Sequence, residues 1–230
     1  MRQTATTEHA RKGRLVVLVG PAGAGKTTLA HRLIDAKPEQ RAFSVSHTTR
    51  AMRRGEQHGV DYTFVDRETF EALIDAGGFV EWAEVHGNLY GTSYAAVEHH
   101  LRAGRDVLFD VDIVGATALF DAYQARCRLV FITPPDWAAL CGRLERRGSE
   151  TPETLQRRLR TARRELHGVL EQLDAGVPWG LLCNDDLDRA SADLEALLAT
   201  PAGPVTVGDR APVERMRADA DADPRAAAGS

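Results

Sequence analysis

The sequence predicts an α/β protein in which a central parallel sheet lies between two layers of helices. Two observations predict this fold class. Short apolar runs of strand length alternate along the chain with longer segments of helical periodicity. The residues directly after these runs are repeatedly glycine or polar, and in an open parallel sheet ligands bind beyond the carboxyl ends of the strands. One edge of the sheet is therefore expected to carry the functional site.

The first predicted strand, residues 15–19, leads directly into the glycine-rich stretch GPAGAGKTT. This stretch satisfies G-x-x-x-x-G-K-[ST] in the order strand, loop and helix, which is the context that the motif requires. Its glycines let the loop point N–H groups inward, at the positive end of the next helix. Lys26 adds a charge for the β- and γ-phosphates, and the Thr27 hydroxyl is an oxygen ligand suited to Mg²⁺.

The stretch therefore predicts a P-loop NTPase fold and a nucleoside triphosphate site. A glycine-rich loop with a chance lysine would not explain the strand before it or the helix after it, in which Leu29, Leu33 and Ile34 recur at helical spacing. The residues of the predicted site are Gly20, Pro21, Ala22, Gly23, Ala24, Gly25, Lys26, Thr27 and Thr28.

Further strands and helices are predicted as far as Val85. The first helix ends near Pro38, which cannot continue it. Residues 46–56 are polar and basic and predict a loop rich in anion-binding groups. Asp66 is a candidate cap for a helix that Gly77 and Gly78 end. The strands predicted here are residues 42–46, 61–65 and 79–85, and the helix between the last two has an apolar face of Phe70, Leu73 and Ile74.

Glu81 lies in the predicted strand 79–85. Period-two alternation places it on one face with Phe79, Ala83 and Val85. A carboxylate on an apolar face is costly unless hydrogen-bond donors surround it. The alternative is that this face is turned to solvent, and periodicity alone leaves the two interpretations open.

The second half of the chain repeats the alternation. Residues 106–112 predict a strand whose far end carries Asp110 and Asp112 on one face, as in Mg²⁺-dependent phosphate sites. The last strand, residues 179–183, delivers Asn184 and Asp185. The other elements predicted here are a helix over residues 93–103, a strand over 128–133 stopped by two prolines, and a helix-rich segment over 137–173.

The helix-rich segment contains eight arginines. Gly148 and Ser149 interrupt it, and Pro152 suits the first turn of a second helix. Most of the arginines are interpreted as a solvated face paired with acidic neighbours, while a minority near the break would reach phosphates if the segment closes as a lid. The arginines are Arg143, Arg146, Arg147, Arg157, Arg158, Arg160, Arg163 and Arg164, and the predicted buried stripe is Leu155, Leu159, Ala162 and Leu166.

Composition sets broad limits on function. The 230 residues are 27% charged and 43% apolar, with a formal net charge of −4, as in ordinary globular proteins. This charge argues against general nucleic-acid binding. No apolar run is long enough for a membrane span or a signal peptide, so a cytoplasmic location without a membrane partner is expected. Residues 1–13 and 201–230 have few large apolar side chains, and we expect both to be disordered.

The sequence resembles the guanylate kinase family over about residues 14–200. Besides the glycine-rich loop, the resemblance rests on ordered blocks, and their order makes it far more specific than the loop alone. It implies ATP-dependent phosphorylation of GMP to GDP with Mg²⁺, by a monomer or homodimer. It also implies a core of residues 14–46 and 94–200, a GMP-binding insert of about 47–93 and a lid of about 143–165. The blocks are SVSHTTR, RGEQHGVDYTFV, FVEWAEVHGNLYGTS, VLFDVDIVGA and ERRGSETPETLQRRL.

The resemblance also implies roles for individual residues. The catalytic set is Lys26, Arg50, Asp110 near the metal, and the lid arginines Arg143, Arg147 and Arg158. Thr27 would bind Mg²⁺, and Asn184 and Asp185 would contact adenine. Arg50, Arg53, Tyr62 and Tyr90 would bind the GMP phosphate, and Ser46, Glu81, Thr92 and Asp112 would read guanine, with Glu56 and Gly91 in the same GMP-binding set.

Three departures from the family pattern keep alternatives open. Met52 replaces a usual proline, Leu89 a common tyrosine and Tyr94 a common arginine. The last two are expected to flank the guanine pocket, so dGMP or a modified purine nucleotide is an alternative acceptor. A non-catalytic guanylate kinase-like binding module is a further alternative, although its phosphate loop would usually be degraded. So is a P-loop kinase for another phosphorylated small molecule, for which the guanine-reading residues would have no purpose.

Overall fold

The structure is a computed structural model that describes residues 13–85, 87–146, 151–199 and 209–227. The predicted disordered segment at the N-terminus lies outside these residues except for Gly13. Arg147 of the predicted lid set also lies outside them. None of the helices that the structure describes combines the length and apolar character that crossing a membrane requires.

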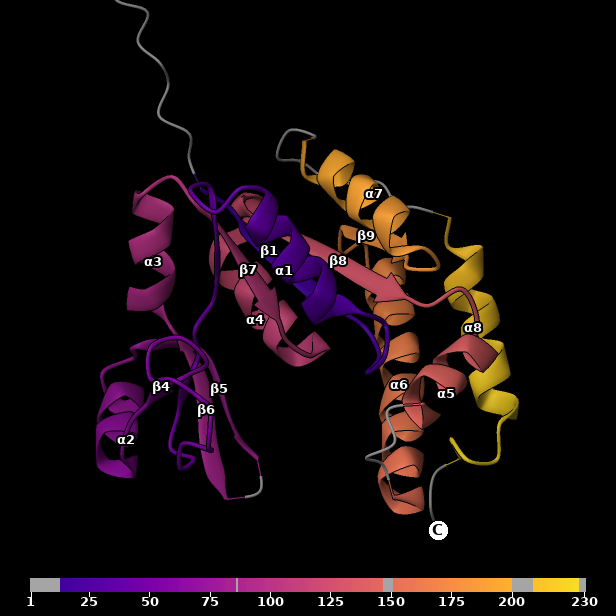
Figure 1. The fold of residues 1–230 in the computed structure, drawn as a ribbon, viewed down its shortest axis with the longest axis horizontal. Helices are drawn as coiled ribbons and strands as arrows, with labels where there is room; N and C mark the ends of the chain where they lie inside the picture. Colours follow the sequence, from indigo (N-terminus) through magenta and orange to yellow (C-terminus); the bar gives the residue numbers. More distant parts are fainter. Residues whose placement is uncertain (1–12, 86, 147–150, 200–208, 228–230) are drawn as a thin grey trace, which may run out of the picture.

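A five-stranded sheet forms the centre of the molecule (Figure 1). Its order is β2-β7-β1-β8-β9, and every neighbouring pair is parallel, as the sequence predicts. The strands are β1 (Leu15–Val19), β2 (Arg41–Phe43), β7 (Asp106–Asp110), β8 (Cys127–Thr133) and β9 (Trp179–Cys183).

Helices cover both faces of this sheet because the strand side chains alternate between two apolar layers. In β1, Val16 and Leu18 pack with α1 and α7, while Leu15 and Val17 pack with the helices of the other face. All of these β1 side chains are fully buried. The first layer is α1 (Lys26–Ala36) and α7 (Leu187–Ala199), and the second is built mainly from α3 (Tyr94–Arg102), α4 (Ile113–Tyr123), α5 (Trp137–Glu145) and α6 (Pro152–Asp174).

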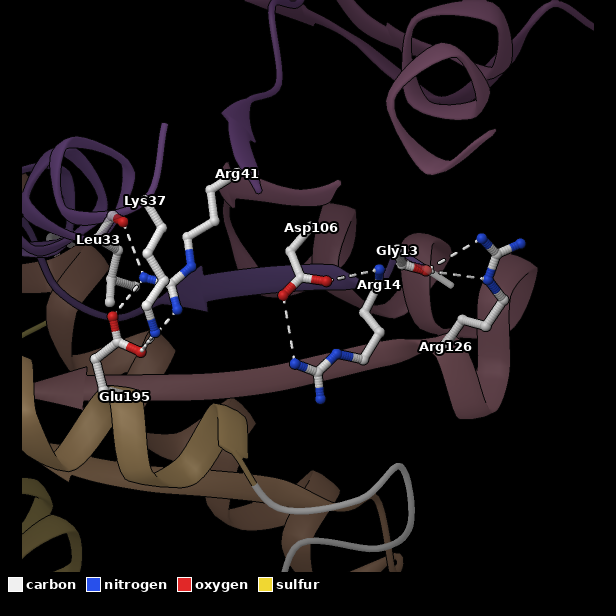
Figure 2. A network of polar contacts seen from close by, with 8 residues as sticks. All are labelled: Gly13, Arg14, Leu33, Lys37, Arg41, Asp106, Arg126 and Glu195. Carbon is white, nitrogen blue, oxygen red and sulfur yellow. Dashed lines mark hydrogen bonds and ion pairs between the residues drawn. The ribbon is translucent and has the colours of Figure 1, made fainter. Parts of the chain in front are cut away.

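Ion pairs hold the sheet together near the amino ends of its strands (Figure 2). The fully buried Asp106 of β7 accepts from the Arg14 backbone N–H at 3.0 Å and pairs with its guanidinium at 3.3 Å. Arg41 of β2 forms two hydrogen bonds to Glu195 of α7, at 2.5 and 2.7 Å. Arg41, with a second bond from Lys37, lowers the pKa of Glu195 to about 2. The charged side chains at this edge of the sheet therefore stabilise the fold by pairing with one another.

A second, smaller sheet with α2 (Arg67–Asp75) lies apart from the large one (Figure 1). Asp66 caps α2 by accepting from Thr69 N at 2.7 Å, as predicted. Phe70, Phe79 and Leu89 form a small core between α2 and the sheet. The strand order is β4 (Thr63–Phe64), β3 (His47–Thr48), β6 (Asn88–Ser93) and β5 (Phe79–Val85), of which β3 and β6 are not among the predicted strands.

The prediction of a disordered tail is wrong for residues 211–222, which form α8 (Ala211–Ala222). Val213, Met216 and Ala220 recur at helical spacing and are at most 2% exposed. They pack into the same apolar layer as α5 and α6. Composition misses this helix because a helix that docks on an existing surface needs only a few apolar side chains, and small alanines allow close approach.

Candidate functional site

The glycine-rich loop curls over the carboxyl end of β1 and leads into α1. Gly20, Gly23 and Gly25 all have positive φ, of 140°, 91° and 92°, which a residue with a side chain rarely adopts. A Cβ at Gly25 would lie 2.3 Å from Asn184 Nδ2, so the loop has no room for one. The loop's remaining predicted members, Pro21, Ala22, Ala24 and Thr28, belong to the same turn and first helical turn. The loop thus has the backbone form that an anion cradle requires.

Lys26 and Thr27 face Asp110 at the end of β7. Lys26 Nζ donates to Gly20 O at 2.6 Å and lies 3.7 Å from Asp110 Oδ1. Thr27 Oγ1 donates to Asp110 Oδ2 at 2.7 Å. A hydroxyl and a carboxylate are hard oxygen ligands, and Mg²⁺ in phosphate sites takes few protein ligands because phosphates and water supply the rest. Thr27 and Asp110 therefore form a pair of oxygen ligands that fits a magnesium ion, although the described residues include no cluster of three or more metal-binding side chains.

Arg143 and Asn184 hold the phosphate loop by donating hydrogen bonds to its backbone carbonyls. Arg143, on α5, donates to Asn184 O at 2.7 Å and to Gly23 O at 3.4 Å. The buried Asn184 side chain donates to Ala24 O at 2.7 Å. Asp185 forms an ion pair with Arg189 on α7, and Arg189 lowers the pKa of Asp185. The Asn184 side-chain amide thus stabilises the phosphate loop. Its position in the sequence alone does not reveal this role.

Arg158, the second described lid arginine, is half-buried on α6. Pro152 begins that helix, as predicted. Leu159, Ala162 and Leu166 of the predicted stripe are buried. Leu155 is partly buried and packs beside them. Arg143 and Arg158 therefore lie on two successive helices, and Arg143 contacts the phosphate loop.

On the opposite side, Arg50 is held by Glu56 and two aromatic rings. Arg50 forms two hydrogen bonds with the Glu56 carboxylate, at 2.7 and 3.0 Å, and its guanidinium lies 5.4 Å from the centre of the Tyr62 ring. Glu56 also accepts from Arg53 N at 2.7 Å. The hydrogen bond from Arg50 lowers the pKa of Glu56. Tyr90 lies 6.0 Å from Tyr62, ring to ring, so these groups form one polar cluster with the exposed Arg53 beside it.

The predicted face of Glu81 is right for Ala83 and Val85 but wrong for Phe79. A register shift lies between Phe79, which pairs with Ser93, and Glu81, which pairs with Thr92. Because Ser93 and Thr92 point to opposite faces of β6, this bulge places Glu81 on the face opposite Phe79. Phe79 packs against Phe70 at 4.4 Å between ring centres, whereas Glu81 lies on the face of Thr92 and Tyr90. Neither an apolar face nor open solvent describes this environment.

Glu81 is half-buried there and accepts a hydrogen bond from Thr92 Oγ1 at 2.6 Å. Burial raises the pKa of Glu81, and the charge of Asp112 adds to this shift while Thr92 opposes it. The predicted strand 106–112 is too long, because Asp112 lies just beyond β7 and its carboxylate caps α4 by accepting from Gly115 N at 2.9 Å. The Glu81 carboxylate on the small sheet and the Asp112 carboxylate beyond β7 therefore lie close enough to affect each other electrostatically.

A cavity of about 330 Å³ joins the two halves of the site. It is lined by Thr27 and Asp110 from the large-sheet side and by Ser46 and Tyr62 from the small-sheet side. A larger hollow of about 680 Å³ lies along α6 between arginines and Ala226, and none of the predicted site residues lines it. We place the site at the smaller cavity because Thr27, Asp110, Ser46 and Tyr62, which are all predicted site residues, line it together.

Gly91 and Leu89 are turned away from this cavity. A Cβ at Gly91 would lie 2.9 Å from Phe79 Cδ1, and Leu89 is 2% exposed in the core with Phe70. The expectation that Leu89 flanks the guanine pocket is therefore wrong, since β6 points it to the opposite face. Tyr94 is 41% exposed and packs beside Tyr123, and Met52 is 55% exposed.

Glu165 on α6, which is not among the predicted site residues, interacts electrostatically with several of them. Its Oε2 atom is buried and has no hydrogen-bond partner among the described residues. Burial raises its pKa to about 7, Lys26 opposes the shift, and Asp112 and Asp110 add to it. Glu165 is thus within electrostatic range of both halves of the site. No motif marks it, because only the packing of α6 brings it there.

The comparisons with known proteins agree with the fold. A family model described as guanylate kinase matches residues 12–200. The guanylate kinase of Nocardia farcinica is 46% identical over 84% of this chain and 97% of its own length. The guanylate kinase of Nitratidesulfovibrio vulgaris is 50% identical over 81% of this chain and 86% of its own. The crystal structure of guanylate kinase from Anaplasma phagocytophilum superposes with a TM-score of 0.59 at 31% identity, covering 82% of this chain and 85% of that one.

Proposed function

The chain belongs to the guanylate kinase family, whose reaction is the ATP-dependent phosphorylation of GMP to GDP, and we propose that the residues around the 330 Å³ cavity carry this reaction here. The single observation that carries the assignment of residues is the position of Glu81. It is a half-buried carboxylate on the small sheet that already accepts from Thr92 and lies close enough to Asp112, beyond the end of β7, to be affected by its charge.

Glu81 would select guanine by hydrogen-bond polarity. Guanine presents two N–H donors on one edge, whereas adenine presents an acceptor at the corresponding ring nitrogen. A half-buried carboxylate facing that acceptor would lose its partner, at a cost of roughly 1–3 kcal/mol for each unpaired group. Ser46 can donate to the guanine carbonyl oxygen, Thr92 can do so once its single hydroxyl hydrogen leaves Glu81, and Asp112 adds a second acceptor near Glu81.

The phosphate groups would be bound from both sides. The loop N–H groups and Lys26 would hold the ATP phosphates, and Arg50, Arg53, Tyr62 and Tyr90 would hold the GMP phosphate. The attacking GMP phosphate oxygen is already ionised, so the protein needs no general base. Its residues align the two phosphates and offset their charge, and Arg143, Arg147 and Arg158 would do the same for the transferring group.

We propose that Thr27 and Asp110 hold Mg²⁺, whose oxygen-rich preference their donor pair satisfies. The ion, when bound, supplies charge neutralisation between the β- and γ-phosphates. Closure of the two sides over the cavity would exclude water, which otherwise takes the γ-phosphate. Adenine would lie near Asn184 and Asp185, where the family places it.

A nucleoside monophosphate panel tests the assignment. With ATP and Mg²⁺, we expect rapid conversion of GMP to GDP, slower use of dGMP, and poor use of AMP, CMP and UMP. Equal turnover of AMP and GMP would contradict the role of Glu81. Turnover of no acceptor would favour the non-catalytic binding module.

A further inference from the structure

Residues 209–227 lie beyond the region that the family model matches, yet they are packed against the helices of the site. Figure 1 shows α8 beside α6 and close to α5. Val213, Met216, Ala220 and Ala226 are each at most 2% exposed. A segment with this much burial is an integral part of the domain and fixes whatever it contacts.

Two side chains of this segment contact α5, one at each end of the helix. At the first residue of α5, Trp137 Nε1 donates to Asp223 Oδ2 at 2.8 Å. At the last, Arg225 pairs with Glu145 at 3.2 Å, and it also donates to Cys141 Sγ at 3.4 Å. Asp223 and Arg225 are themselves joined by a hydrogen bond of 2.8 Å. The pair therefore links both ends of α5 to the C-terminal segment.

The helix held in this way lies directly against the phosphate loop. A Cβ on Gly23 would lie 3.4 Å from Leu144 and 3.5 Å from Leu140, so the loop rests on α5. Between these leucines, Arg143 donates to Gly23 O and Asn184 O. A small rotation of α5 would move Arg143 and the loop together, and misplacement by about 1 Å can cost on the order of 100-fold in rate.

We infer that Asp223 and Arg225 are positioning residues for phosphoryl transfer: they fix α5 so that Arg143 is in place behind the phosphate loop. The inference rests on the proposed role of Arg143. The Asp223 side chain is 9% exposed, and the bonds from Arg225 and then Trp137 lower its pKa to about 2. The Asp223 carboxylate consequently remains charged throughout the neutral pH range.

The test compares Asp223→Ala with Arg210→Ala in the full-length chain. Asp223→Ala removes the link to α5. Arg210→Ala removes a bond of 2.7 Å from the same segment to Asp174 on α6, far along the chain from α5. We expect Asp223→Ala to lower kcat about tenfold, the size of one lost positioning hydrogen bond, with KM for GMP little changed. Arg210→Ala should leave kcat within about twofold of the parent chain. Melting temperatures report whether either variant is simply less folded.

A double-mutant cycle separates positioning from a general loss of structure. If Asp223 acts through Arg143, Asp223→Ala will lower kcat much less in an Arg143→Ala background than in the parent chain. Asp223→Asn, which keeps an acceptor for Trp137, should recover part of the lost kcat. An equal fold-loss in both backgrounds, or a loss in Arg210→Ala as large as in Asp223→Ala, would overturn the inference. An Arg143→Ala variant with unchanged kcat would instead refute the proposed role of Arg143.

Discussion

The two halves of the site are built in different ways. The phosphate loop lies at the end of a fully buried strand and is braced by backbone and side-chain hydrogen bonds from Lys26, Arg143 and Asn184. The proposed GMP-binding half lies on a small sheet whose core is Phe70, Phe79 and Leu89. Its functional side chains are held mainly by one another. The half around the phosphate loop, called the donor side because ATP would donate the phosphate there, is thus preformed. The half on the small sheet, called the acceptor side because GMP would accept the phosphate there, can rearrange when its ligand replaces the internal partners of its side chains.

This contrast predicts different consequences of mutation. On the donor side a substitution should impair phosphoryl transfer with any acceptor, because the ATP phosphates are misplaced. On the acceptor side a substitution should change the choice or affinity of the acceptor and leave ATP binding intact. The following variants test that division, beginning with the largest expected effect.

Lys26→Ala removes the cation that the phosphates would meet. Nothing else on the loop carries a full charge, so we expect kcat to fall by about 10³-fold or more for every acceptor. The melting temperature should stay close to that of the parent chain, because Lys26 bonds to two loop carbonyls and pairs with the half-buried Asp110, which keeps Thr27 as a hydrogen-bond donor. Lys37→Ala, near the other end of α1 and paired with Glu195, is the matched control and should keep full turnover. Normal turnover by Lys26→Ala would remove the phosphate-loop assignment.

Glu81→Gln changes the polarity of the guanine-reading group at almost constant size. The new amide would place a donor against guanine's own donors, so kcat/KM for GMP should fall by about 10- to 100-fold. KM for ATP should be unchanged. Glu84→Gln alters a carboxylate on the same strand but the opposite face, where it is exposed, and should behave like the parent chain. A matching loss of ATP affinity in Glu81→Gln would place this residue on the donor side.

Glu56→Ala tests whether acceptor groups depend on one another. Glu56 holds the Arg50 guanidinium with two hydrogen bonds, so its loss should let Arg50 leave its place over Tyr62. We expect KM for GMP to rise about tenfold while kcat changes less. Arg67→Ala breaks the exposed Arg67–Glu71 pair in the same half and serves as control. If Glu56→Ala instead tightened GMP binding, Glu56 would be a competitor for Arg50 and not its support.

The same contrast explains how much the sequence could predict. The donor half follows from local rules: an apolar strand, glycines with positive φ and a lysine at a helix start are all adjacent in the chain. The five strands of the large sheet, the Asp66 cap and the start of α6 at Pro152 were predictable for the same reason. Roles on the acceptor half came from resemblance, since its residues are scattered from Ser46 to Asp112.

What the sequence could not give depends on contacts between distant segments. The bulge before Glu81 is invisible to period-two reasoning, and it reverses which residues share a face. Helix α8 has a composition typical of a tail and is ordered because α5 and α6 offer it a surface. The strand β6 contains Gly91 and lacks a long apolar run, so its pairing with β5 and β3 defines it.

Glu165 interacts electrostatically with Lys26 and Asp110 on one half and Asp112 on the other, and gives the smallest expected effect, one on stability. Burial raises its pKa to about 7, above the ordinary value of 4.5 that applies to the unfolded chain. The folded state therefore binds a proton more readily than the unfolded state. The loss of folding stability caused by this group is therefore absent below about pH 4.5, grows as pH rises, and is complete above about pH 7.

Glu165→Gln removes this loss of stability by remaining neutral. We expect urea unfolding to give it about 2 kcal/mol more stability than the parent chain at pH 8 and little difference at pH 4.5. Glu153→Gln, exposed at the start of the same helix, should show no such gain at pH 8. Equal stabilities of Glu165→Gln and the parent chain at pH 8 would mean that Lys26 fully offsets the burial of Glu165, which would then belong to the preformed donor half.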